Sequence, residues 1–398
     1  MIADKITAIQ RALKEAELDA WLFMCFQHND PISLSLLGLA EKGLCTRRCY
    51  YLVPAEGEAR RLVHRLEPGM LDHLPGSKSS YLTWQQHAQA LRDLLSGCKA
   101  VAAQYSPEAQ IPSISRLDAG TAELLRASGV ELVSSSDLVQ GFAAVWSGKQ
   151  LDSHRRAADH LHRIVLHAFD RVAEGLRAGQ ALTEFGVQRW ICEAFETSGL
   201  EGEGDPIVAV NEHSADPHYQ PSAEGSSPIH EGDFLLIDLW AKERAAESVY
   251  ADITWCGVCA PAPTDRQGEI FEIVRRARDA ALALVQDRYP AHGMAPLMGF
   301  EVDDACRAVI TEAGYGDDFF HRTGHSIDTS DHGQGANMDN LETHDTRVLV
   351  PMTGFSIEPG IYLTGDFGVR SEINVALTAD KAEVTGGDSQ RELLRLLS

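Results

Sequence analysis

Three histidines fall within the short segment "HRTGHSIDTSDHGQG", at positions 321, 325 and 332. The segment contains too much glycine and too many small polar residues to form a stable helix. Histidine is both a common metal ligand and a common general base. The segment is therefore a candidate part of an active site, in which one histidine reacts or binds with partners from elsewhere in the chain.

Four carboxylates lie in strongly apolar surroundings: Asp238 in "FLLIDLW", Asp252 in "VYADITW", Glu358 in "FSIEPG" and Glu372 in "SEINVAL". A buried, ionised carboxylate without a partner costs several kcal/mol. Arg370 stands two residues before Glu372, but no basic residue closely flanks the other three. These side chains therefore need cations.

The spacing of the four carboxylates pairs them. Asp238 precedes Asp252 by 14 residues and Glu358 precedes Glu372 by 14, and each span reads as strand, turn and strand. A hairpin brings its strands within about 5 Å, so two facing hairpins can gather all four, and His325 can add a nitrogen. Such a set suits two divalent ions such as manganese, cobalt or zinc, which together can activate water and polarise a carbonyl. Any one carboxylate could be coincidental among 58 acidic residues, but the paired set is the stronger observation.

Composition limits the classes of partner. The chain has 398 residues, enough for two or three domains, and its 35 basic and 58 acidic residues give a net charge of −23. This charge disfavours nucleic acid and anionic membranes. The N-terminus lacks the pattern of a signal peptide, and no run is long and apolar enough to span a bilayer. We expect a cytoplasmic protein with neither a nucleic-acid nor a membrane partner.

The first domain is expected over residues 1–145, with an α/β fold. Its expected strands are 20–24, 49–53, 60–64, 100–105 and 130–135, with helical patterns between them. It shows no glycine-rich phosphate loop and no cluster of ligand-type residues. A structural or assembly role follows as the expectation.

The second domain is expected over residues 150–398, with an α+β fold in which helices flank an antiparallel sheet. A long helix should end at Gly179, and the next should begin after Thr183 as its N-cap. The remaining expected elements are strands 206–210, 233–240, 250–258, 355–359 and 369–377, helices 265–289 and 301–314, and a short terminal helix.

Cys256 and Cys259, in "CGVC", have the spacing of a redox or zinc motif. No second such pair completes a zinc site, and the motif lies in an expected strand rather than at the start of a helix. We therefore favour ordinary strand cysteines that pack as small hydrophobes over a redox role.

Six segments of the second domain occur in the order and spacing of a known family: "PHY" (217–219), "LLIDL" (235–239), "YADIT" (250–254), "HRTGHSI" (321–327), "IEPGIYL" (357–363) and "GVRSEINV" (368–375). The domain resembles the pita-bread metallopeptidases, which include prolidase, Xaa-Pro aminopeptidase, methionine aminopeptidase and creatinase. The first domain resembles the N-terminal domain of the prolidase, Xaa-Pro aminopeptidase and creatinase branch. Methionine aminopeptidases usually lack that domain, so the chain looks most like an Xaa-Pro dipeptidase.

The resemblance implies a role for each carboxylate. Asp238 would bind one metal ion, Asp252 and Glu372 would bridge both ions, and His325 and Glu358 would complete the other site. Glu358 would also be the candidate general base.

The resemblance also implies roles for residues that do not bind metal. His218 and His332 would contact the scissile carbonyl and the substrate, and Tyr362 would assist the proton relay. Arg370 would contact the substrate carboxylate or brace the bridging glutamate. His344 or Arg347 could also hold a prolyl carboxylate, whereas His321 is interpreted as structural.

The function implied by the resemblance is hydrolysis of the Xaa-Pro bond with two divalent ions, manganese being expected and cobalt or zinc being alternatives. The substrate would be a small peptide with proline in second position, and the protein would be a homodimer. The alternatives are an Xaa-Pro aminopeptidase for longer peptides, a metal-free creatinase-like hydrolase and a catalytically silent binding protein. The last two usually lack part of the ligand set, whereas this chain keeps all five ligands.

The sequence also departs from the family pattern. The first hairpin is longer, with "AKERAAESV" between the aspartate strands, Trp240 replaces a glycine, and "GHSID" lacks the second glycine of the usual motif. None of these changes removes a ligand. They bear on substrate preference rather than on metal binding.

Overall fold

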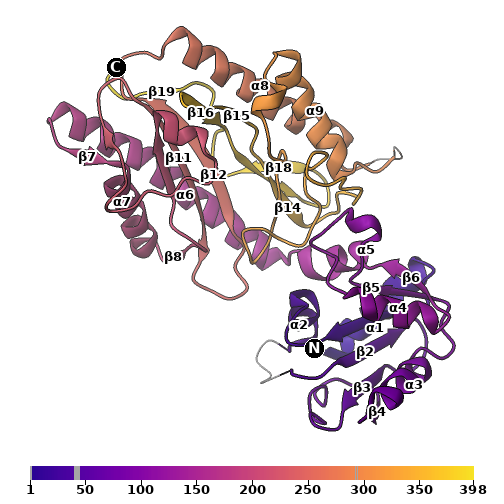
Figure 1. Ribbon diagram of the computed structural model, residues 1–398. Coiled ribbons are helices and arrows are strands. Elements are labelled where there is room, and N and C mark those ends of the chain that lie inside the picture. Colours follow the sequence, from indigo (N-terminus) through magenta and orange to yellow (C-terminus); the bar gives the residue numbers. More distant parts are fainter. Residues whose placement is uncertain (1, 40–44, 292, 294) are drawn as a thin grey trace. The chain divides into compact units, whose positions relative to one another are not determined.

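The computed structural model describes residues 2–39, 45–291, 293 and 295–398. Its contacts divide the chain into two units, Met1–Ala143 and Ala144–Ser398, and Figure 1 shows their elements. Within the described residues, none of the helices combines the length and the apolar composition that a membrane span requires.

The first unit is built on one six-stranded sheet in the order β4-β3-β2-β1-β5-β6. The strands are β1 (Ala20–Cys25), β2 (Cys49–Pro54), β3 (Arg60–His64), β4 (Ser77–Tyr81), β5 (Ala100–Ala103) and β6 (Glu131–Ser134), and the helices are α1 (Ile2–Glu15), α2 (Pro31–Leu37), α3 (Trp84–Leu94), α4 (Ala119–Ala127) and α5 (Ser136–Val139). The β1–β2 and β2–β3 pairs are antiparallel and the other pairs are parallel. Strand β4 was not predicted, because "SKSSY" is mostly polar and exposed and so lacks a hydrophobic pattern.

Three cysteines of the first unit pack in the same hydrophobic core. Cys25 and Cys49 are directly opposed on β1 and β2, and Cys45 packs in the same hydrophobic cluster. Hydrogen bonding within the trio lowers the pKa of the Cys45 thiol and raises the pKa values of the other two. Cys45 and Cys49 are four residues apart in the sequence, whereas Cys25 reaches them only through the pairing of β1 with β2.

The second unit packs helices on both sides of a central hairpin. Its longer helices are α6 (Gly148–Arg177), α7 (Glu184–Thr197), α8 (Asp265–Arg288) and α9 (Gly299–Glu312). Its strands are β7 (Leu182–Thr183), β8 (Leu200–Glu201), β9 (Ile207–Val210), β10 (Pro228–Ile229), β11 (Phe234–Glu243), β12 (Ala251–Val258), β13 (Ser326–Ile327), β14 (Thr353–Ile357), β15 (Gly360–Leu363), β16 (Phe367–Arg370), β17 (Ile373–Leu377), β18 (Ala382–Thr385) and β19 (Leu394–Arg395). As expected, Thr183 caps α7, its hydroxyl accepting from the Gly186 amide at 3.0 Å.

The hairpin β11–β12 separates two hydrophobic cores because its side chains alternate between faces. On β11, Ile237 and Leu239 belong to the core that includes α6 and α7, whereas Leu236 belongs to the core that includes α8 and α9. Figure 1 shows α8 and α9 side by side next to β15 and β16. Asp238 lies on the same face as Leu236, so it points away from α6 and toward the strands that follow α9.

Cys256 in β12 and Cys259 just after its end pack in different cores, Cys256 with α8 and α9 and Cys259 with α6 and α7. Both thiols are buried and free. This placement agrees with ordinary strand cysteines.

The second predicted hairpin is interrupted where its carboxylates stand. Strand β14 pairs with β17, and β15 pairs with β16. The strand pairing is therefore interrupted at Glu358, between β14 and β15, and at Glu372, between β16 and β17. The expected continuous strand 369–377 is therefore two strands. The expected terminal helix is wrong, because Leu394–Arg395 instead forms β19 and pairs parallel with β12.

Candidate active site

A cavity of about 760 Å³ opens over the two hairpins of the second unit. The side chains that line it are mostly charged, aromatic or imidazole groups: Ile207, Asp216, Pro217, His218, Gln220, Asp238, Trp240, Asp252, Phe320, His321, Arg322, His325, Asp331, His332, Glu342, Glu358, Arg370 and Glu372. All five predicted metal ligands are among them.

The first hairpin presents both of its aspartates on one face. Asp238 is opposite Thr254, and Asp252 is opposite Trp240, so all four point the same way. The Thr254 hydroxyl lies 3.0 Å from Asp238 Oδ1 and 2.8 Å from Glu372 Oε2. This threonine therefore joins the carboxylates of the two hairpins.

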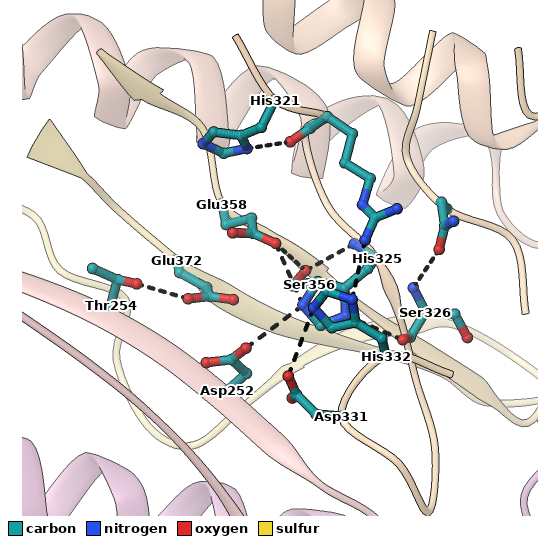
Figure 2. A network of polar contacts seen from close by, with 12 residues as sticks. Asp252, Thr254, His321, His325, Ser326, Asp331, His332, Ser356, Glu358 and Glu372 are labelled. Carbon is teal, nitrogen blue, oxygen red and sulfur yellow. Dashed lines mark hydrogen bonds and ion pairs between the residues drawn. The ribbon is translucent and has the colours of Figure 1, made fainter. Parts of the chain in front are cut away.

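His325 faces the carboxylates from the opposite side of the cavity. Its Nε2 lies 3.4 Å from Glu358 Oε1 and 3.6 Å from Asp252 Oδ2, and Figure 2 shows the ring pointing into this group. Its Nδ1 is 3.2 Å from the Ser326 carbonyl, which leaves Nε2 to face the acids. One atom each from Asp252, His325 and Glu372 lie within 4.8 Å of one another, close enough to hold one ion.

The site has more buried negative charge than the protein balances. Asp252 Oδ1 and Glu372 Oε1 are buried and have no hydrogen-bond partner among the described residues. Burial, followed by the neighbouring carboxylates, raises the pKa values of both groups well above their ordinary range. A divalent cation would satisfy both orphaned oxygens, so the donor set of oxygens and one imidazole fits the predicted metals.

Among the described residues, Arg370 is the arginine that forms an ion pair with one of the four predicted carboxylate ligands. It forms an ion pair with Asp238, and its Nε donates to the Thr254 hydroxyl at 2.9 Å. Of the two roles that the resemblance offered, bracing of the carboxylates is closer to this geometry. The braced group is Asp238 directly and Glu372 only through Thr254.

The predicted catalytic side chains fall into two sets. His218 and His332 line the cavity, and the His332 ring lies 4.0 Å from the His325 ring between centroids. Tyr362 is buried behind the cavity, where its hydroxyl is 2.7 Å from His321 Nε2. His321 lines the cavity as well as making the expected local contact, a Nδ1 hydrogen bond to the Arg322 carbonyl. Its interpretation as purely structural is therefore incomplete.

The structure does not bring Arg347 or His344 to the cavity. Arg347 is buried and forms a two-pronged ion pair with Asp345. His344 is exposed, 4.4 Å from Phe300 between ring centroids, and hydrogen-bonds with Asn340. Neither side chain lines the cavity, so this geometry gives no support to the expectation that they hold a substrate carboxylate.

Two charged residues of the cavity were not singled out from the sequence. Asp331 lies beside His325 and His332, and one atom of each could share an ion. Burial raises its pKa to about 7. Arg322 lines the cavity from the same loop as His321. Asp331 and Arg322 lie in polar, glycine-containing sequence, where neither apolar neighbours nor periodicity marks a buried charge, and the only available signal was adjacency to His332 and His321.

Comparison with known proteins identifies the family. The model of metallopeptidase family M24 matches residues 153–379, which is more than half of the chain. The chain belongs to metallopeptidase family M24. The expected family is thereby confirmed, and its M24 segment contains the whole cavity described above.

Curated relatives of this M24 chain include peptidases. It is 31% identical to the probable dipeptidase PepE of Mycobacterium bovis over 259 residues, 65% of this chain and 63% of that protein. It is 31% identical to the Xaa-Pro dipeptidase of Lactobacillus helveticus over 237 residues, 58% of this chain and 56% of that protein. The aligned part thus spans less than two thirds of the length of these relatives.

Solved structures confirm the expected fold, an α/β domain followed by a pita-bread domain. The dipeptidase PepE from Mycobacterium ulcerans matches with a TM-score of 0.71 at 24% identity, covering 99% of this chain and 98% of that chain. The prolidase from Thermococcus sibiricus matches with a TM-score of 0.65 at 22% identity, covering 99% of each. At these identities the likeness establishes the fold of each unit.

Proposed function

We propose that the protein is an Xaa-Pro dipeptidase that hydrolyses the bond before proline with two divalent ions held by Asp238, Asp252, His325, Glu358 and Glu372. The observation that carries the proposal is the convergence of these five side chains with two buried, orphaned oxygens. The family assignment and the Xaa-Pro dipeptidases among the relatives support the substrate class.

A bound pair of divalent ions supplies Lewis acidity and an activated water. Glu358 is placed to take a proton at Oε1, which also accepts from the Ser356 hydroxyl at 3.0 Å. Burial raises the pKa of Glu358, but the charges of His325, His321 and Arg370 outweigh it and lower the pKa overall. Glu358 is therefore held ionised, as a proton acceptor must be.

His218 and His332 stand at the cavity wall, where their ring nitrogens can stabilise charge on the substrate. The pair His321 and Tyr362 lies behind them. The 2.7 Å contact from His321 Nε2 to the Tyr362 hydroxyl gives a proton a short route away from the cavity. We assign His321 to this relay.

The volume of the cavity suits a small peptide. Its volume lies within the range of small-molecule sites, roughly 300–1,000 Å³. Ile207, Trp240 and Phe320 provide apolar surface on which a proline ring can pack. Trp240, which departs from the family pattern, is thereby proposed as part of the wall that selects the substrate.

Manganese as the native metal, a homodimeric assembly and a cytoplasmic location are further parts of the proposal. The hard oxygen donors with one imidazole suit manganese, although cobalt and zinc use similar donors. All eight cysteines are free thiols, which suits a reducing compartment.

The test is a substrate panel on metal-stripped protein with manganese, cobalt or zinc added back. Xaa-Pro dipeptides, Xaa-Pro-Yaa tripeptides and Xaa-Ala dipeptides would be compared by release of the free amino acid. We expect metal-dependent turnover of Xaa-Pro dipeptides above the other two groups. Preferred turnover of tripeptides would favour an Xaa-Pro aminopeptidase, and turnover without any metal would overturn the proposal.

A further inference from the structure

Arg322 and Asp331 flank one histidine at the cavity. Arg322 Nη2 lies 3.2 Å from Nδ1 of His332, and Asp331 Oδ2 lies 3.8 Å from Nε2 of the same ring. Both side chains line the cavity, and Figure 2 shows Asp331 pointing toward the two histidine rings. A basic and an acidic side chain therefore lie at opposite ring nitrogens of His332.

Neither charge is neutralised within the described part of the chain. The Arg322 guanidinium forms no ion pair there, and its contact is with His332. Asp331 Oδ1 is buried and has no hydrogen-bond partner. Arg370 and Arg347 differ from Arg322 in this respect, because each forms an ion pair, Arg370 with Asp238 and Arg347 with Asp345.

Asp331 and Arg322 line the cavity but are not among the five predicted metal ligands. They add one acidic and one basic side chain to the cavity beyond the set proposed to hold the metals. A ligand with one charge of each sign at its two ends would satisfy both.

We propose that Arg322 and Asp331 bind the two ends of a zwitterionic dipeptide, Arg322 its free carboxylate and Asp331 its free α-ammonium group. This inference rests on the proposed function and assigns the side chains that hold the two free ends of its dipeptide substrate. A guanidinium presents the fork of donors that matches a carboxylate.

The test compares four ligands that differ only at their ends: an Xaa-Pro dipeptide, its C-terminal amide, its N-acetyl derivative and an Xaa-Pro-Yaa tripeptide. For each, kcat/KM is measured, and binding of the analogue with a reduced scissile carbonyl is measured by calorimetry. We expect wild type to prefer the free dipeptide by about 10- to 100-fold over either blocked form, the loss typical of one charged hydrogen bond.

Variants of Arg322 and Asp331 should separate recognition of the carboxylate end of the dipeptide from recognition of its ammonium end. Arg322→Gln should abolish the preference over the amide and keep the preference over the N-acetyl form, and Asp331→Asn should do the reverse. Asp304→Asn is the control, because Asp304 is an exposed carboxylate that does not line the cavity. It should leave both ratios unchanged. Metal content by mass spectrometry should be the same in all four proteins.

The outcomes distinguish this inference from the proposed function. Wild type that prefers Xaa-Pro dipeptides over tripeptides but does not discriminate against the C-terminal amide or the N-acetyl form overturns the inference alone. A loss of metal in Asp331→Asn also overturns it alone, because Asp331 would then be a metal ligand. Wild type that binds the free-ended analogue selectively but hydrolyses nothing keeps the inference and overturns the proposed activity. Wild type that neither binds nor hydrolyses overturns both.

Discussion

Arg370 forms an ion pair with Asp238, a carboxylate predicted from the sequence to bind a metal ion. Both side chains are buried, so the guanidinium partly balances a group of carboxylates that would otherwise repel one another. The same arginine reaches the Thr254 hydroxyl, which also contacts Glu372. Arg370 thus stabilises the folded site in the absence of a metal ion.

Arg370→Met should destabilise the metal-free protein more than the metal-loaded protein. Removing one partner of a buried pair costs about 3–5 kcal/mol, and a bound cation would offset part of that cost. The measurement is urea unfolding in chelator and in saturating manganese, with the exposed Arg244→Met as control. An equal loss under both conditions would show that Arg370 does not balance the carboxylates.

Asp252→Asn and Glu372→Gln should each lose bound metal and activity together. Each residue places an orphaned, buried oxygen in the site, and an amide cannot supply the missing charge. Metal content by mass spectrometry is the readout, and Asp304→Asn, an exposed carboxylate outside the cavity, is the control. Retention of two ions with near-normal turnover in either variant would exclude that residue as a metal ligand.

His325→Ala and His332→Ala should differ although the two rings lie 4.0 Å apart. The first should lower metal occupancy, because His325 Nε2 faces Asp252 and Glu358. The second should keep the metal and reduce turnover by about 10²–10³-fold, the usual effect of losing one transition-state hydrogen bond. If His332→Ala strips the metal while His325→Ala keeps it, the two roles must be exchanged.

Protonation of the His154 ring should destabilise the fold in mild acid. Burial lowers its pKa to about 4, and its ring hydrogen-bonds the Tyr250 carbonyl and the Thr385 hydroxyl. Because the folded pKa lies below the ordinary value of 6.5, the unfolded chain binds the proton first. The stability from the neutral ring is thus complete above pH 6.5 and is lost as the pH falls toward 4, on the order of 3 kcal/mol.

His154→Gln should remove this part of the pH dependence. Unfolding free energies of wild type and variant, measured by urea titration between pH 4 and pH 7, should therefore converge as the pH falls. A constant difference between the two curves across this range would mean that His154 does not titrate on unfolding.

The sequence was most informative where chemistry and secondary structure coincide. Asp238 and Asp252 interrupt apolar strands, so their burial and their shared hairpin could be predicted, and all five predicted ligands do line one cavity. Glu358 and Glu372 were also predicted as a pair, although the break in their hairpin was not. That break depends on pairing between strands, which the local pattern does not encode.

The sequence was least informative where burial is created by tertiary packing. Asp331 and Arg322 occupy polar loop sequence, and Arg347 looked available because its partner Asp345 was not recognised as buried. Cys25, Cys45 and Cys49 likewise become neighbours only when β1 and β2 pair. In each case the deciding contact lies far away in the chain or inside a loop without periodicity.

The unpaired buried oxygens of Asp252 and Glu372 also bear on the resistance of the protein to degradation. A cation that binds only the folded chain raises the free energy of unfolding by about 2.7 kcal/mol when its concentration is a hundred times its Kd. A chain short of that cation opens more often, and proteases act on opened chains. Because Asp252 and Glu372 leave this stabilisation to an outside ion, the supply of the ion would govern the abundance of the protein as well as its rate of turnover.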